Sequence, residues 1–233
     1  MARRRNTRRK PVDNDDTLVD IVEVRDNAQG FVDKNQNLIF GALVGLVILI
    51  GGIFFYNNYF KGPRVQEAAN AMYQAQLQFE RDSFALALAN PAAGYDGFLG
   101  IIDNYSGTPA ANTAKYYAGI SNLHLGEYQA AIDYLNQFSP SGDVLPIMKY
   151  GAMGDAYSEL NQMDKAISNY QSAANAGGND LLAAYYLQKI ALWNEKNNDQ
   201  AAANKIYMQI KEKYPTTQIG QDIERYITRT ATN

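Results

Sequence analysis

The sequence predicts an all-α protein in which a single membrane-spanning helix precedes a solenoid of helical hairpins. Three observations predict this fold class. One run of nineteen residues carries neither a charge nor a strongly polar side chain, which is long enough for a membrane helix. Beyond Pro63, amphipathic helical patterns follow one another, and strand patterns are almost absent. Within that region the sequence repeats with a period of about 35 residues, which is typical of stacked hairpins.

The composition excludes most catalytic chemistry. The chain of 233 residues contains no cysteine, one histidine and one tryptophan, so disulfides, thiolate metal sites, cysteine nucleophiles and a lipid-modified cysteine are excluded. His124 has no second histidine or thiolate with which to build a metal site or a catalytic pair. No phosphate-binding loop, nucleophile elbow or zinc-protease motif occurs. We therefore expect no enzymatic activity, no catalytic or metal-binding residues and no cofactor.

Residues 1–36 are expected to form a basic tail on the cytoplasmic side of a membrane. They hold eight basic and seven acidic side chains, and six of the bases lie between Arg3 and Lys10. This cluster has three interpretations: a determinant of topology, a contact for anionic lipid or ribosomal RNA, or a solvated tail. Because no aromatic side chains are interleaved with the bases, we favour topology together with a solvated tail, and we expect no nucleic-acid partner.

Residues 37–57 are predicted to form the transmembrane helix. The apolar run from Leu38 to Tyr56 spans about 28 Å as a helix, close to the roughly 30 Å hydrocarbon core of a bilayer. A buried core helix and a cleaved signal peptide are the alternatives. Thirty-seven residues precede the run, which is too many for a typical signal peptide, so an uncleaved anchor is favoured. Gly41 and Gly45 have the spacing of small residues that lets transmembrane helices approach closely, so they are candidate helix contacts.

The basic residues also predict the orientation of the anchor. Short segments rich in Lys and Arg tend to remain in the cytoplasm, and the basic cluster precedes the apolar run. We therefore expect a single-pass protein of a bacterial inner membrane, with a cytoplasmic N-terminus and a periplasmic C-terminal domain.

The region after the anchor is predicted to begin with an irregular helical pair over residues 58–105. Its helices are expected around Arg64–Arg81 and Tyr95–Tyr105, joined by a loop that contains Asn90 and Pro91.

Residues 106–233 are expected to form the solenoid, with about three hairpins and a C-terminal capping helix. Residues 116–138 align with residues 150–173 at an offset of 35, and a third copy follows at an offset of 37. Each copy consists of a helix, a turn of about three residues and a second helix.

The small residues of these copies resemble those of the tetratricopeptide repeat, whose period is 34 residues. That family has a small residue where the two helices of a repeat cross and another early in the second helix. The corresponding residues here are Gly119, Gly154 and Ala191 in the first helices and Ala131, Ala166 and Ala203 in the second. Tyr157 fills the family's aromatic place and Pro215 fits its terminal proline, whereas Asn122 and Asn194 depart from the pattern. The resemblance implies a protein-interaction module.

In this family the first helices line the concave surface of the solenoid. By position, the resemblance places ten candidate protein-binding residues on that surface: Tyr116, Ile120, Leu123, His124, Asp155, Glu159, Tyr185, Gln188, Glu195 and Lys196. The set lacks the Lys and Asn arrangement with which some members clamp a carboxyl terminus. An extended or amphipathic polypeptide segment is therefore the expected ligand.

The order of parts, a short basic tail, one anchor and then repeats, resembles the ancillary subunit of the bacterial Sec translocon. This resemblance implies a chaperone-like subunit whose partners are Sec translocon components, periplasmic folding factors or translocating chains. The alternative is a scaffold of another cell-envelope assembly, such as secretion, outer-membrane or cell-wall machinery.

Overall fold

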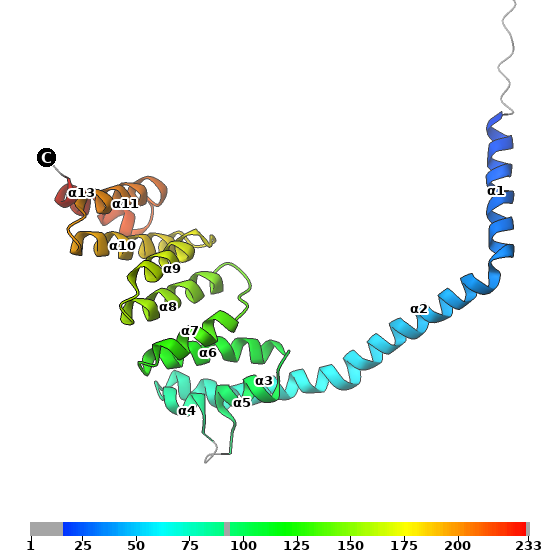
Figure 1. Ribbon diagram of the computed structural model, residues 1–233, viewed down its shortest axis with the longest axis horizontal. Coiled ribbons are helices and arrows are strands. Elements are labelled where there is room, and N and C mark those ends of the chain that lie inside the picture. The colour runs from blue at the N-terminus through cyan, green and yellow to red at the C-terminus, as the bar shows by residue number, and fades with distance from the viewer. Residues whose placement is uncertain (1–15, 91–93, 232–233) are drawn as a thin grey trace, which may run out of the picture. The chain divides into compact units, whose positions relative to one another are not determined.

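The computed structural model describes residues 16–90 and 94–231 (Figure 1). Within these residues the chain is helical and contains no β-strand, which confirms the all-α prediction. The chain divides into two compact units between Lys61 and Gly62. The basic cluster from Arg3 to Lys10 lies outside the described residues.

The first unit consists of two helices and a π-helical turn, which are α1 (Asp16–Lys34), α2 (Gln36–Tyr56) and η1 (Asn57–Lys61). Residues 1–36 were expected only as a basic tail, and the structure shows that this segment is helical from Asp16 to Lys34. At the boundary between α1 and α2, the Asn35 amide Nδ2 donates a hydrogen bond to the carbonyl oxygen of Phe31 over 2.8 Å. This contact satisfies a carbonyl group at the C-terminal end of α1.

Helix α2 contains the apolar run. None of its residues is buried, and the described part of the chain contains one helix long and apolar enough to cross a membrane. Its bounds lie one residue before the predicted 37–57 at each end. A Cβ atom added at Gly41 or Gly45 would meet no other atom within 4 Å, so both positions are open to a neighbouring helix. Their role as helix contacts stays a prediction.

The second unit begins with three helices rather than the expected irregular pair. They are α3 (Gly62–Glu80), α4 (Phe84–Leu88) and α5 (Gly97–Asn104). The additional short helix α4 follows a reversal at Asp82, which adopts the left-handed conformation (φ 55°) that Asp tolerates better than most residues. Phe98 is fully buried and stacks on Tyr117, with 5.1 Å between the ring centroids. This contact fixes α5 against the first hairpin.

Three helical hairpins follow in chain order (Figure 1). Their helices are α6 (Pro109–His124) and α7 (Tyr128–Gln137), α8 (Leu145–Glu159) and α9 (Met163–Asn175), and α10 (Asp180–Lys196) and α11 (Gln200–Lys213). The turn of each hairpin contains one residue with positive φ, namely Gly126, Asn161 and Asn198. These residues are equivalent at the offsets of 35 and 37, and Gly and Asn adopt this conformation most readily. The repeat alignment therefore matches the positions of the turns.

Side-chain caps begin several of these helices. In each case the side-chain oxygen of the residue before the helix accepts a hydrogen bond from a backbone N–H of the first turn. The capping residues are Thr108 for α6, Asn179 for α10, Asp199 for α11 and Thr217 for the following short helix.

The C-terminal cap is two helices instead of the single one expected. Helix α12 (Gln218–Asp222) and helix α13 (Glu224–Thr230) are separated at Ile223. The Ile223 side chain is 1% exposed and belongs to the hydrophobic cluster of α10 and α11. The break allows this side chain to enter the core while α13 continues across α11.

Small residues sit where helices approach closely. A Cβ at Gly119 would lie 2.6 Å from Leu135 Cγ of α7, and a Cβ at Gly154 would lie 2.5 Å from the Tyr170 ring of α9. Gly151 has the same function between repeats, because its Cβ would lie 1.9 Å from the Tyr186 hydroxyl of α10. The resemblance pointed to Gly119 and Gly154 but not to Gly151.

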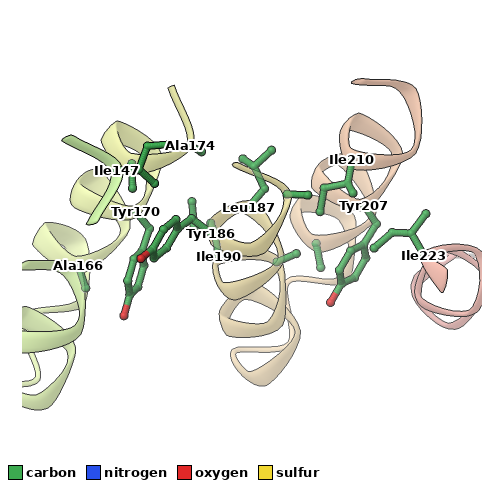
Figure 2. Close-up of a cluster of buried hydrophobic side chains, with 14 residues drawn as sticks. Ile147, Ala166, Tyr170, Ala174, Tyr186, Leu187, Ile190, Tyr207, Ile210 and Ile223 are labelled. Carbon is green, nitrogen blue, oxygen red and sulfur yellow. The ribbon is translucent and has the colours of Figure 1, made fainter. Parts of the chain in front are cut away.

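The largest hydrophobic cluster joins the second and third hairpins to the cap. Figure 2 shows Tyr170 and Tyr186 side by side and Tyr207 near Ile223. The Tyr170 and Tyr186 rings stack with 5.8 Å between centroids. Hydrophobic burial of this kind is the main stabilising contribution to the solenoid.

Candidate functional site

Two adjoining cavities lie on the second unit, where α8 and α10 face the neighbouring repeats. The first has a volume of about 450 Å³ and is lined by Leu123, Tyr128, Asp155, Ser158, Glu159, Tyr170 and Lys189. The second has a volume of about 260 Å³ and is lined by Ser158, Met163, Tyr170, Lys189, Leu192, Trp193 and Lys196. Because three lining residues are common to both, the cavities form one continuous surface, which we call the repeat groove.

A polar triad occupies the centre of the repeat groove. The Tyr170 hydroxyl donates a hydrogen bond to Asp155 Oδ1 over 2.7 Å, and the Lys189 ammonium donates to the same oxygen. The ammonium nitrogen also lies 4.9 Å from the centroid of the Tyr170 ring, within cation–π distance. The three residues come from α8, α9 and α10, so the triad joins two successive repeats. Its two opposite charges neutralise each other.

The two ends of the repeat groove differ in charge. At one end the Tyr128 hydroxyl donates a hydrogen bond of 3.4 Å to Glu159 Oε2. At the other end the Lys196 ammonium lies 5.7 Å from the centroid of the Trp193 ring. One end is therefore acidic and the other is basic and aromatic.

Burial raises the pKa of two tyrosines at the repeat groove. Burial, reinforced by the hydrogen bond to Asp155 and its negative charge, raises the pKa of Tyr170. Burial, together with the Asp155 charge, also raises the pKa of Tyr186 to about 12. Both hydroxyls thus remain protonated at pH values where an exposed tyrosine ionises, and Tyr170 remains a hydrogen-bond donor.

Because the pKa values of these two tyrosines are raised, we expect the protein to lose stability at alkaline pH. Unfolded tyrosines ionise near pH 10, whereas folded Tyr170 and Tyr186 keep their protons to higher pH. Above pH 10 the unfolded state therefore binds fewer protons than the folded state, and the free energy of unfolding falls as the pH rises. We expect Tyr170→Phe to reduce this dependence by up to about 1.4 kcal/mol per pH unit, measured by urea unfolding on both sides of pH 10.

The matched control for this experiment is Tyr73→Phe, because the Tyr73 side chain is exposed. At neutral pH, Tyr170→Phe should itself cost about 1 kcal/mol, since it removes the hydrogen bond to Asp155. An alkaline dependence that is the same in the wild type and in Tyr170→Phe would contradict this assignment.

Four of the ten residues predicted to bind protein line the repeat groove, namely Leu123, Asp155, Glu159 and Lys196. Tyr185 lies beside it, with its ring centroid 5.5 Å from the Lys189 ammonium. Gln188 lines neither cavity.

Three predicted residues of α6 have structural contacts instead. Tyr116 and Ile120 are partly buried against the cluster formed by α7 and α8, and the Tyr116 ring packs 5.3 Å from that of Phe138. His124 stacks on Phe84 of α4, with 4.3 Å between ring centroids and 4° between ring planes. None of the three lines either cavity of the repeat groove, and His124 remains exposed, so their role in binding protein stays a prediction.

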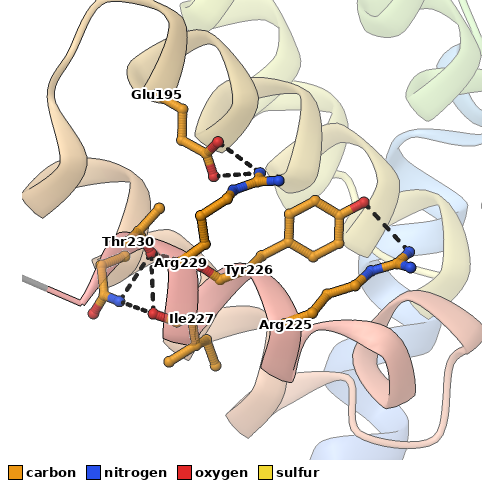
Figure 3. A network of polar contacts seen from close by, with 7 residues as sticks. Glu195, Arg225, Tyr226, Ile227, Arg229 and Thr230 are labelled. Carbon is orange, nitrogen blue, oxygen red and sulfur yellow. Dashed lines mark hydrogen bonds and ion pairs between the residues drawn. The ribbon is translucent and has the colours of Figure 1, made fainter.

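Glu195 faces the C-terminal cap rather than the groove. Its carboxylate accepts two hydrogen bonds from Arg229 Nη2, at 2.9 and 2.6 Å (Figure 3), and its side chain is only 15% exposed. Successive helical residues are rotated by about 100°, so Glu195 and its neighbour Lys196 point to different sides of α10. Glu195 therefore connects α10 to α13, and its role in binding protein stays a prediction.

Seven residues that line the repeat groove are not among the ten predicted ones, namely Tyr128, Ser158, Met163, Tyr170, Lys189, Leu192 and Trp193. Tyr128 and Tyr170 lie on second helices, whereas the resemblance drew its candidates from the first helices only. Asp155 and Lys189 are 34 residues apart on successive first helices. A search for oppositely charged residues about one repeat apart would therefore have identified Lys189 as a partner of Asp155.

No group of three or more His, Asp or Glu side chains suited to a metal ion occurs within residues 16–90 and 94–231. The groove instead offers carboxylates, ammonium groups and aromatic rings, which suit the recognition of a polypeptide.

Comparison with known proteins identifies one segment of the chain. Residues 185–217 match the family model described as tetratricopeptide repeat, whereas no curated protein and no solved structure matches the chain. The matched segment covers most of α10, all of α11 and the turn that leads to α12. The third hairpin is thus similar to a tetratricopeptide repeat, and the second unit is an all-α solenoid of tetratricopeptide-like hairpins.

Proposed function

We propose that this chain is a membrane-tethered protein-interaction module of the bacterial cell envelope. In this proposal the repeat groove binds polypeptide segments in the periplasm, and the chain acts as a chaperone-like ancillary subunit beside the Sec translocon. It catalyses no reaction itself. The observation that carries the proposal is the repeat groove, which joins a polar triad to an apolar and aromatic cavity on a solenoid similar to tetratricopeptide repeats.

The side chains of the repeat groove support binding rather than catalysis. The triad of Asp155, Tyr170 and Lys189 is internally satisfied, and burial keeps the Tyr170 hydroxyl protonated. The sole histidine stacks on Phe84 outside both cavities. The polar groups of the triad are thus engaged with one another, which suits a surface that binds a polypeptide.

The sequence of the first unit supports the proposed location. Helix α2 is long and apolar enough to cross a membrane, and the basic cluster before it favours a cytoplasmic N-terminus. A reporter fused after Asn233 tests this orientation: activity of a periplasmic reporter is expected, and activity of a cytoplasmic reporter would overturn it.

The experiment that tests the partner is co-purification of the tagged full-length chain from its own membranes in mild detergent, followed by mass spectrometry. A variant in which another membrane helix replaces α2 is the control for recruitment through the anchor. We expect Sec channel components or periplasmic folding factors with the wild type and their loss with the exchanged anchor.

A matched pair of variants tests the groove in the same experiment. Leu192→Asp places a charge in the second cavity, and Met208→Asp places one on an exposed position of α11 that lines neither cavity. We expect only Leu192→Asp to lose captured chains. Recovery of another envelope assembly that is retained after the anchor exchange would favour the scaffold role and contradict the Sec assignment.

A further inference from the structure

We infer that the basic end of the repeat groove recognises an internal segment of a partner chain that carries an apolar side chain next to a side-chain carboxylate. The apolar group would pack in the second cavity against Met163, Leu192 and Trp193, and the carboxylate would pair with Lys196. This inference rests on the proposed function and specifies the chemistry of its ligand.

The second cavity provides the apolar contact. Met163, Leu192 and Trp193 line it together with Ser158, Tyr170 and two lysines. Leu192 remains 42% exposed although it lies in the middle of the solenoid. Leu181 and Tyr185, on the same helix, are also exposed. Met and Trp are enriched where proteins bind one another, because Met adapts its shape and Trp buries a large area. An apolar ligand side chain would remove these surfaces from water.

The charges of the groove favour an anion at this end. Lys189 is already paired with Asp155, whereas Lys196 has no carboxylate within 4.0 Å in the described part of the chain. Glu159 lies in the first cavity and is absent from the second. A ligand carboxylate would be repelled by Glu159 and attracted by Lys196, so charge complementarity places it beside Trp193.

The connection between the cavities favours an internal segment over a chain terminus. Ser158, Tyr170 and Lys189 line both cavities, so a polypeptide that occupies one can continue into the other. A terminal carboxylate needs several uncommitted donors, and of the two ammonium groups in the second cavity that of Lys189 is already paired with Asp155, which leaves Lys196. One ammonium is sufficient for the side chain of a Glu or Asp.

The test is a peptide titration of the full-length chain in lipid nanodiscs. Trp193 is the only tryptophan of the chain, so its fluorescence reports directly on the second cavity. The probe is a soluble Gly/Ser peptide without tryptophan that contains Leu-Ser-Glu, with both ends blocked. Alternate residues of an extended peptide are about 6.6 Å apart, close to the roughly 6 Å helical rise from Leu192 to Lys196. Empty nanodiscs are the control for peptide binding to lipid.

Three further peptides separate the contributions of the carboxylate, the apolar side chain and the chain end to binding. One replaces Glu by Gln, one replaces Leu by Ser, and one carries Gln with a free carboxyl end directly after it. With the wild type, we expect Glu→Gln to weaken binding about two- to fivefold, as for an exposed ion pair. We expect Leu→Ser to weaken it about tenfold or more.

Variants of the protein then test whether the preference for the Glu peptide over the Gln peptide depends on Lys196. In Lys196→Gln the Glu and Gln peptides should bind equally, whereas Lys196→Arg should retain the preference for Glu. Lys205→Gln is the matched control, because Lys205 is an exposed lysine of α11 that lines neither cavity.

The inference is overturned by equal binding of the Glu and Gln peptides to the wild type. It is also overturned if the free-ended peptide binds as tightly as the internal Glu peptide, or if no peptide changes the Trp193 fluorescence. Capture of partners that depends on Leu192 in the co-purification would leave the proposed function standing in each of these cases. Loss of that capture would count against the proposed function itself.

Discussion

We expect Tyr207→Ala to lower the free energy of unfolding of the second unit by about 3–5 kcal/mol, the usual cost of removing a large buried ring. Tyr207 is 0% exposed. It lies in the cluster that α10 and α11 form with Ile223 of the cap (Figure 2), and its ring packs 5.2 Å from that of Tyr226. Truncation would leave a cavity that the cap cannot fill without moving α12 and α13.

The measurement is urea unfolding of the full-length chain in detergent, followed by the fluorescence of Trp193. Met208→Ala is the matched control, because Met208 is the next residue of α11 and is 56% exposed. Its effect should stay within about 0.5 kcal/mol. Similar losses of stability for the two variants would show that Tyr207 is not part of a tightly packed core.

Much of the hairpin architecture was predictable, because local chemistry decides it. A residue that tolerates positive φ is needed where a short turn reverses the chain, and Gly126, Asn161 and Asn198 supply it. A small residue is needed where two helices of one hairpin cross, and Gly119 and Gly154 supply it. Both requirements recur once per repeat, so one sequence aligned with itself reveals them.

The groove was less predictable, because it depends on how each hairpin is rotated against the next. A helix of a solenoid packs against its own partner and against the neighbouring repeat, so its apolar positions do not define a single buried face. The adjacent residues Glu195 and Lys196 show the consequence, since one binds Arg229 of the cap and the other lines the second cavity. The residues of the triad, Asp155, Tyr170 and Lys189, lie on three different helices. The spacing of residues within one helix therefore cannot predict it.

One helix in the N-terminal part of the second unit, α4, was missed for a related reason. Helix α4 has only five residues, too few for a helical period to be recognised. Its position nevertheless decides the environment of His124, because Phe84 of α4 stacks on the imidazole ring. A short helix that the sequence pattern does not reveal thus gives His124 an aromatic contact that was not predicted.

The second large effect is expected for Gly151→Leu, which should lower the free energy of unfolding by about 3 kcal/mol, the upper end of the range for overpacking. A Cβ at this position of α8 would lie 1.9 Å from the Tyr186 hydroxyl and 2.2 Å from its ring. Tyr186 is held by stacking on Tyr170, so its ring cannot move away without disturbing the triad of the repeat groove.

Two measurements follow from this coupling. In urea unfolding, Ser168→Leu on the exposed side of α9 is the control for an added leucine, and it should change stability by less than about 0.5 kcal/mol. Combining Gly151→Leu with Tyr186→Ala should cost less than the sum of the single changes, because the second change removes the ring with which the leucine collides. In the peptide titration, Gly151→Leu should also weaken binding, since displacement of Tyr186 reaches the groove through Tyr170. Additive costs together with unchanged peptide binding would mean that the contact between successive repeats does not position the groove.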